Sequence, residues 1–168
     1  MSNMININKS SPENFELLFP VLPTLDNIRE SNSLAMNIYA SVLPSISLDS
    51  KEHNWMGGVV HMDAGAISFE PWFVNFLIDD DFNNWKILYN WMNYINNNKD
   101  RYGRARPDYV VDATLNVLNN MREPIMTVNF KNIWPNMLGQ VEMSYREGEM
   151  VLSSNTNFMY DRYEIETI

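Results

Sequence analysis

The chain has 168 residues, no cysteine and a formal net charge of −9 at pH 7. The absence of cysteine excludes disulfides, thiolate metal sites and thiol catalysis, and the acidic balance disfavours tight binding of nucleic acid, because that affinity comes largely from lysine and arginine on phosphate. Solubility is the simplest reason for the charge, although an acidic surface would also repel DNA and let it pass without sticking.

Length and hydrophobic content predict one folded domain and no membrane insertion. The 45% hydrophobic fraction can supply a core, whereas no apolar run approaches the roughly 20 residues of a membrane helix. The polar residues 1–13 predict a flexible N-terminal arm, and residues 14–168 predict a single domain. Apolar residues alternate over 15–19 and again over 34–42, and prolines follow both runs, which is typical of two short strands.

An apolar tip is predicted after these strands. Trp55 and Met56 are followed by two glycines, which indicates a loop or a bent hairpin. If the tip is exposed, Trp55 and Met56 would dock against another subunit; the alternative is that they fold back onto the core. Five tryptophans in a chain of this length favour the use of some aromatic surface for partners.

Two segments carry more apolar surface than one small domain needs. Residues 67–78 are apolar on both faces of a predicted strand, so the second face needs a helix or another subunit. A helix is predicted around residues 82–96, with Asp79–Asp81 capping its start. Its predicted core stripe is Trp85, Leu88, Met92 and Ile95, and a second stripe contains Trp91. We therefore expect Trp72 and Trp91 among the inter-subunit contacts.

The loop after the helix is basic in an otherwise acidic chain. Arg101, Arg104 and Arg106 lie within the turn-rich residues 99–109. We expect these arginines to pair with an acidic patch on a neighbouring copy. Contacts between unlike surfaces are head-to-tail, and they close into rings or continue as filaments.

The last third of the chain predicts strands around a corner. Apolar residues alternate over 113–117, 126–130 and 141–145, and a final strand over about 150–165 has its alternation broken, as a bulge would break it. Trp134 and Pro135 predict a structural corner between the second and third of these strands. The elements are thus mainly β with one helix in the middle, an α+β class.

No sequence motif carries catalysis. Asp79–Asp81 could bind a divalent cation, but helix capping explains them more simply. His53 and His61, with carboxylates nearby at Asp49, Glu52 and Asp63, could form a metal or acid–base site, yet their spacing matches no known ligand pattern. We expect no cofactor, no metal and no enzymatic activity. Two alternatives stay open: a small acidic metal-dependent enzyme, and a monomeric module that binds a partner's strand at its sheet edge.

The order of these elements resembles the tail tube protein of contractile-tailed bacteriophages. The matching features are the strand at 15–19, the strand that ends at Pro44, the strand, turn and helix over 73–85, and the corner over 130–139, all within residues 14–165. The resemblance implies two packed antiparallel sheets with one flanking helix. It also implies hexameric rings, in which the strands of all copies join into an oligomeric β-barrel around a DNA channel.

The same resemblance implies a structural virion protein that assembles in the host cytoplasm. The rings would stack into the inner tail tube inside a contractile sheath, with the sheath, the baseplate or tube initiator, and the tail terminator as partners. DNA would pass transiently, without specific binding. The N-terminal arm is longer and the loop over 99–106 more basic than expected for a main tube subunit. A tube initiator, a terminal tube ring or the tube of an injection or secretion machine is therefore the alternative.

Overall fold

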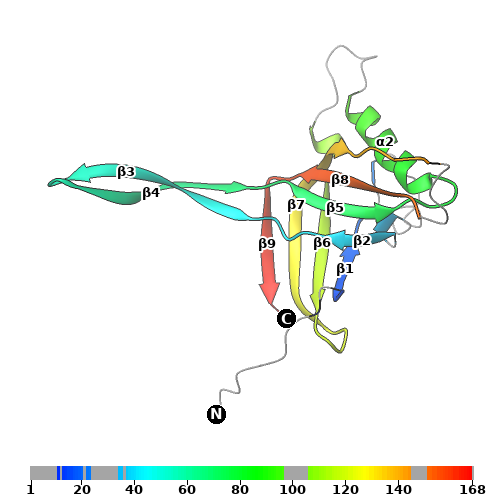
Figure 1. The fold of residues 1–168 in the computed structure, drawn as a ribbon, viewed down its shortest axis with the longest axis horizontal. Helices are drawn as coiled ribbons and strands as arrows, with labels where there is room; N and C mark the ends of the chain where they lie inside the picture. The colour runs from blue at the N-terminus through cyan, green and yellow to red at the C-terminus, as the bar shows by residue number, and fades with distance from the viewer. Residues whose placement is uncertain are drawn as a thin grey trace.

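The fold is mainly β, and helix α2 flanks the sheets (Figure 1). The computed structural model describes residues 11, 13–20, 22–23, 34–35, 37–96, 106–144 and 151–167. The elements within them are β1 (Phe15–Leu18), β2 (Ile38–Ser41), β3 (Ile46–Trp55), β4 (Gly58–Phe69), β5 (Trp72–Leu77), α2 (Asn83–Ile95), the 3-10 helix η1 (Arg106–Asp108), β6 (Val111–Leu118), β7 (Pro124–Leu138), β8 (Ser153–Met159) and β9 (Arg162–Thr167). The predicted arm over residues 1–13 lies outside the described residues, apart from residues 11 and 13.

Strand β7 joins two layers of sheet. Its first half pairs with β6 and β9, and its second half, Trp134–Leu138, pairs with β8. One layer therefore has the order β1-β6-β7-β9 and the other β7-β8-β5-β2, with every pair antiparallel. The layers run crosswise in Figure 1, as in packings where one bent strand turns the corner between two sheets. The predicted fold of two antiparallel sheets with a flanking helix is confirmed.

The core lies between the two layers and is aromatic. Trp72 of β5 stacks on Phe130 of β7, with ring centroids 4.2 Å apart and planes 9° apart. Phe158 of β8 packs against Trp72 with centroids 5.5 Å apart. All three side chains are fully buried. Because Trp72 and Phe130 come from different layers, their contact holds the layers together.

Helix α2 has the predicted range but a different buried face. The prediction was 82–96 and the helix spans Asn83–Ile95. The buried residues are Asn84, Ile87, Leu88 and Trp91. The predicted core stripe is therefore wrong, since only Leu88 of its four members is buried. Periodicity alone could not choose between two apolar stripes on one helix.

The start of α2 depends on a buried asparagine. Phe82 occupies the N-cap with φ 57°, and no side chain caps the helix there. The Asn84 side chain accepts the N–H of Trp85 at 2.8 Å and donates to the carbonyl of Leu77 at 2.6 Å. The prediction that Asp79–Asp81 cap the helix is wrong. An amide both donates and accepts, so it can tie the helix to the strand before it, whereas a carboxylate only accepts.

Three predicted strands differ from the structure. Residues 34–35 are helical, so the strand predicted over 34–42 is reduced to β2. The strand predicted over 67–78 breaks at Glu70 and Pro71 into β4 and β5, because proline has no N–H for the ladder. Residues 139–144 are not a strand. The broken alternation near the C-terminus is the step at Tyr160–Asp161, where the chain passes from β8 to β9 and changes layer.

Gly139→Ala is expected to lower the free energy of unfolding by about 1–3 kcal/mol. The Gly139 N–H donates to the carbonyl of Asn155 at 2.7 Å. A Cβ at Gly139 would lie 1.8 Å from the side-chain oxygen of Asn155 and 2.9 Å from its backbone oxygen. The side chain can rotate away, but the backbone oxygen is held by the hydrogen bond to Gly139 itself.

Urea unfolding measures this loss, and Gly58→Ala is the matched control. A Cβ at Gly58 would meet its nearest atom at 3.6 Å, an ordinary contact, so the control should stay within about 0.5 kcal/mol of the parent. Equal losses in the two variants would contradict the packing described at Gly139.

Candidate assembly surfaces

The β3–β4 hairpin projects far from the body of the protein (Figure 1). Its strands pair with each other alone among the described strands, from Ile46↔Phe69 at the base to Trp55↔Gly58 at the tip. Every described side chain from Ile46 to Ser68 is exposed. An isolated two-stranded ribbon is at best marginally stable in water, so we expect a hairpin of this length to lie on a partner.

The outer half of the hairpin has an apolar face and a polar face. Side chains alternate between faces along a strand, and directly paired residues share a face. The cross-strand pairs therefore gather Lys51, His53, Trp55, Val60 and Met62 on one side, which we call the outer hairpin face. The opposite side carries Ser50, Glu52, Asn54, Val59, His61 and Asp63. An exposed face that presents Trp, Val and Met together is typical of a contact surface.

The predicted apolar tip is exposed. Trp55 is 61% exposed and Met56 is 93% exposed, and Met56 and Gly57 form the turn with φ 47° and 81°. The alternative in which the tip folds back onto the core is therefore wrong. That Trp55 and Met56 contact another subunit stays a prediction.

The base of the hairpin is fixed beside β9. Phe69 packs on Tyr163 with ring centroids 5.3 Å apart, and the Tyr163 hydroxyl donates to the carbonyl of Pro44 at 3.3 Å. The Tyr160 hydroxyl donates to the carbonyl of Glu70 at 2.8 Å. Burial, followed by the neighbouring Tyr163 and Glu70, raises the pKa of Tyr160 to about 12, so this donor stays protonated. The hairpin thus leaves the body on its β9 side.

Two of the predicted inter-subunit contacts belong to the core. Trp72 and Trp91 are both 0% exposed, so neither can touch a neighbour, and the prediction is corrected for both. Their apolar partners lie inside the same chain: Trp72 stacks on Phe130, and Trp91 packs on Phe158 and donates to the carbonyl of Tyr109 at 2.8 Å. The sequence pattern correctly indicated large buried surfaces, but it could not tell which molecule covers them.

The predicted basic patch is described only at one arginine. Arg101 and Arg104 lie outside the described residues, and their contact with a neighbouring copy stays a prediction. Arg106 forms an ion pair with Asp161 of the same chain. Part of the charge of the basic loop is therefore compensated within the protomer.

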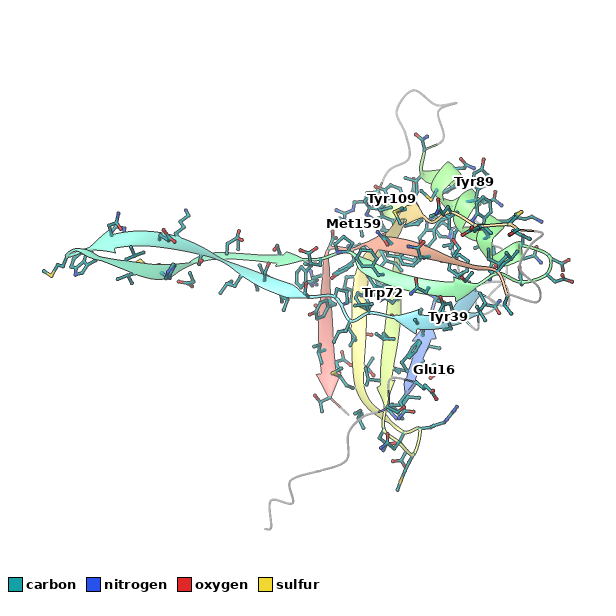
Figure 2. The ribbon with its side chains drawn as sticks, viewed as in Figure 1. Glu16, Tyr39, Trp72, Tyr89, Tyr109 and Met159 are labelled. Carbon is teal, nitrogen blue, oxygen red and sulfur yellow. The ribbon has the colours of Figure 1, made fainter. Side chains whose placement is uncertain are left out.

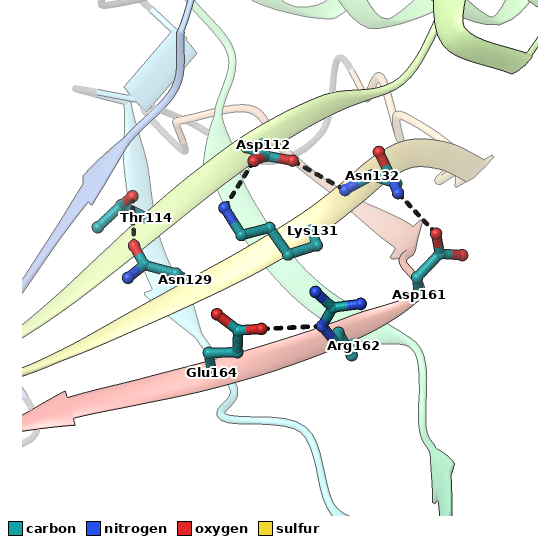
Figure 3. A network of polar contacts seen from close by, with 8 residues as sticks. All are labelled: Asp112, Thr114, Asn129, Lys131, Asn132, Asp161, Arg162 and Glu164. Atoms are coloured by element: carbon teal, nitrogen blue, oxygen red, sulfur yellow. Dashed lines mark hydrogen bonds and ion pairs between the residues drawn. The ribbon is translucent and has the colours of Figure 1, made fainter.

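The bend of β7 lies next to the predicted corner and is held by carboxylates (Figure 3). Strand β7 runs through Trp134 and Pro135, and the residue in the left-handed conformation is Asn132, with φ 58°. The Asn132 N–H donates to Asp112 at 3.0 Å, and its side chain donates to Asp161 at 2.7 Å. Lys131 pairs with Asp112 at 2.8 Å. Trp134 is only half-buried, while Pro135 is buried.

Both carboxylates of this corner network are stabilised in their charged form. Partial burial acts to raise the pKa of Asp112, but hydrogen bonds from Lys131 and from the Asn132 N–H outweigh it and hold that pKa below its ordinary value of 3.8. The Asn132 side chain is the main cause of the lowered pKa of Asp161, and Arg106 adds to it against partial burial. A carboxyl whose pKa is lowered on folding stabilises the fold above its unfolded pKa. That stability is lost as the pH falls below 3.8 through the lowered folded value.

Asp161→Asn is expected to weaken this acid dependence by about 0.2–1 kcal/mol, a small amount because the network is solvent-exposed and screened. Urea midpoints measured above and below the ordinary carboxyl pKa of 3.8 give the loss for the parent and the variant. Glu166→Gln, on β9 but outside the network, is the control and should keep the full acid dependence. An Asp161→Asn protein that loses as much stability in acid as its parent would contradict the role of this carboxylate.

An open groove of about 540 Å³ lies between the edge strands β1 and β2. Residues that line it include Glu13, Phe15, Glu16, Leu18, Ile38 and Tyr39. Among the described strands β1 pairs only with β6, and β2 only with β5, so no described strand pairs with the other backbone edge of either. Leu18 is 45% exposed and Tyr39 is 52% exposed. Free edges flanked by exposed apolar side chains are features that proteins normally cover.

The two histidines of the alternative metal or acid–base site do not converge. His53 and His61 lie on opposite faces of the hairpin. Across the described part of the chain, no group of three or more histidine or acidic side chains could hold a metal ion. Nor is any helix in those residues long and apolar enough to cross a membrane.

Comparison with known proteins places this architecture in one family. A family model described as phage tail tube protein matches residues 10–166. The tail tube terminator protein of Enterobacteria phage T4 is 24% identical over 168 residues, covering 95% of this chain and 90% of that protein. Among solved structures, the tube-terminating cap of the anti-feeding prophage matches with a TM-score of 0.67 and 14% identity, over 99% of this chain and 97% of that one. The anti-feeding prophage baseplate, 6-fold symmetrised, matches with a TM-score of 0.66 and 11% identity, over 95% and 97% of the two chains.

The two structural matches show a shared fold. The family match covers nearly the whole chain, and it includes both sheet layers, the projecting hairpin and the flanking helix. The family and the T4 relative are named for a structural part of a tail and not for an enzyme. The chain therefore belongs to the phage tail tube protein family.

Proposed function

We propose that this protein forms the ring that ends the tail tube of a contractile phage tail. The observation that carries the proposal is the match to the T4 tail tube terminator, which extends over 95% of this chain and 90% of that protein. The fold shared with the tube-terminating cap of the anti-feeding prophage agrees with this place in the tail. A main tube subunit and, given the fold shared with a baseplate structure, a tube initiator are the alternative places.

The ring is built from copies arranged head to tail. Strands β1 and β9 are the two edges of one layer, so joining β9 of one copy to β1 of the next continues the sheet and removes its free edges. Continued around the ring, this layer becomes the wall of an oligomeric β-barrel. We take the ring to be hexameric, in keeping with the six-fold symmetry of the similar baseplate structure.

The face of the same layer that points away from the core suits the wall of a channel for DNA. Pairs of side chains hydrogen-bond to one another across β6 and β7: Thr114 donates to Asn129 and Thr127 donates to Asn116, each at 3.0 Å. Amides and hydroxyls that already bond to one another, on a chain with a net charge of −9, give phosphate little to bind. DNA would thus pass transiently and without specific binding.

The partners follow from this place in the tail. They are further copies of the chain, the last ring of the tail tube, and the sheath protein around it, with the baseplate at the far end of the same tube. The protein is part of the virion, assembled in the host cytoplasm, and its role is structural.

Negative-stain electron microscopy over a concentration series tests the proposal. A terminator is expected to form single rings with a central hole that do not stack, and to stop elongation when added to growing tubes of the same phage. Long tubes of the pure protein would make it the main tube subunit instead. Monomers at every concentration would contradict a ring altogether.

A further inference from the structure

Lys131 and Arg162 are the only basic residues on the described strands of the layer β1-β6-β7-β9, the wall of the proposed channel. They pair directly across β7 and β9, so they share one face of the sheet. The neighbouring pair, Phe130 and Tyr163, packs ring on ring on the core side, and successive side chains of a strand point to opposite faces. Lys131 and Arg162 therefore point away from the core, toward the proposed channel.

Each of these two cations is paired with a carboxylate on the same face (Figure 3). Lys131 Nζ lies 2.8 Å from Asp112 Oδ2, and Arg162 Nε donates to Glu164 Oε1 at 2.9 Å. The hydrogen bond to Asp112 raises the pKa of Lys131, so this cation stays charged. The side chains of Lys131 and Arg162 are 36% and 61% exposed, so a phosphate could reach either cation if the carboxylates did not hold it.

The other end of the same face is acidic. Glu16 of β1 and Glu166 of β9 lie in one row across the layer, the row that contains Thr127. No lysine or arginine lies in this row. Figure 2 shows the two ends of the layer: Glu16 lies in the lower part of the body, and Tyr109, next to η1, lies in the upper part. The face therefore has an acidic end and an end where the charges are paired.

The acidic end is too distant to neutralise the two cations. Thr127 and Lys131 are four residues apart, which is about 13 Å along a strand, whereas the screening length at physiological salt is about 8 Å. The charge of Glu166, which pairs with Thr127, is thus largely screened at Lys131. Asp112, in contrast, is in direct contact at 2.8 Å. Local pairing, rather than the net charge of the chain, is what neutralises these cations.

We propose that Asp112 and Glu164 neutralise the cations of the channel wall, so that the phosphates of duplex DNA pass without an ionic contact. This inference rests on the proposed ring and its channel, and it names the residues that keep the wall from binding DNA. Every copy in the ring repeats both ion pairs. Loss of one carboxylate from the chain therefore frees a complete girdle of cations at one height of the channel, where several phosphates can be bound at once.

Binding of duplex DNA to assembled rings tests the proposal. Asp112→Asn keeps an oxygen that can accept the Asn132 N–H but removes the charge beside Lys131. We expect this variant to bind linear DNA about tenfold more tightly than the parent, with a gain that fades as the salt concentration rises. Glu166→Gln is the matched control, because it removes the same charge from the same face without freeing a cation, and it should bind like the parent. Equal gains in the two variants would overturn the inference.

Two further variants show which cation is responsible for the gain. Glu164→Gln frees Arg162 and is expected to strengthen DNA binding independently of Asp112. Adding Lys131→Gln to Asp112→Asn should return the affinity to the parent value, since the freed cation is then gone. A gain that survives Lys131→Gln would contradict the pairing described here.

The form of the DNA separates the channel from the outside of the ring. A closed circular duplex cannot thread a closed ring, so Asp112→Asn rings should bind the same DNA only after it has been cut once. Equal binding of the cut and the circular DNA would place the contact outside the channel and overturn the inference. Variant rings that are seen in electron micrographs but bind no more DNA than the parent would refute the role of the carboxylates and leave the proposed function intact. Monomers of the parent at every concentration would refute both.

Discussion

Trp72→Ala is expected to lower the free energy of unfolding by about 3–5 kcal/mol, the largest effect of any single substitution considered for the isolated chain. Trp72 is 0% exposed and stacks on Phe130 of the other layer, so its removal leaves a cavity where the two layers meet. Its indole N–H also donates to the Ser41 hydroxyl at 2.9 Å. The substitution would remove this hydrogen bond between β5 and β2 and leave the Ser41 hydroxyl without this partner. Urea unfolding followed by circular dichroism, at a concentration where the protein is monomeric, measures the change.

Trp55→Ala is the matched control, since it removes the same side chain from an exposed position. We expect the free energy of unfolding of this variant to stay within about 0.5 kcal/mol of the parent. If the two variants unfold at the same urea concentration, either the Trp72 site collapses without a cavity or Trp55 packs against the body. The first result would contradict the cavity expected at Trp72, and the second would contradict the exposure described for Trp55.

The strictly alternating segments could be predicted from the sequence. Strands β1, β6 and the first half of β7 have one apolar face and one polar face, so a period of two identifies them. Helix α2 was predicted within one residue at each end, because its apolar positions recur at helical spacing and an asparagine run follows. Each of these elements packs one face on the same core, so the apolar positions in its sequence pattern include the residues that are buried.

Elements that depend on long-range partners could not be predicted in the same way. The bend of β7 needs Asp112 and Asp161, which are distant in sequence and meet only at Asn132. The break between β4 and β5 had a local signal in Pro71, but the apolar residues on both sides of it concealed the change from an exposed hairpin to a buried strand. Two apolar faces also look the same in a sequence whether a second layer or a second subunit covers them, so the sequence pattern predicts contacts with a neighbour for Trp72 and Trp91 that lie inside the chain.

The candidate assembly surfaces were only partly visible in the sequence. The apolar tip at Trp55 and Met56 was found from its glycines. The outer hairpin face was not predicted, although its residues occupy alternate positions in the chain. Lys51, His53 and Trp55 come before the turn, and Val60 and Met62 come after it. The groove had no local signal, because residues 19–37 separate β1 from β2 and the two strands form it only through pairing with β6 and β5.

Shortening the hairpin is expected to abolish ring formation while leaving the protomer folded. Ser50 and Asp63 pair directly across the ribbon, so replacing residues 51–62 with Asn-Gly closes a two-residue turn at that point. The deletion removes the outer hairpin face together with the tip. No described side chain in this segment is buried in the protomer, so the free energy of unfolding should change by no more than about 0.5 kcal/mol.

Assembly should respond very differently to the same deletion. A contact that contributes even about 1.4 kcal/mol per subunit shifts each association step tenfold, and a closed ring repeats that contact at every interface. Sedimentation velocity over a concentration series measures the loss of rings, with Glu52→Gln on the opposite face of the hairpin as a control that should assemble like the parent. A shortened protein that still forms rings would show that the edges of β1 and β9 suffice to close them. A shortened protein that unfolds at lower urea than the parent would show that the hairpin packs on its own body, because only then would its removal expose a core.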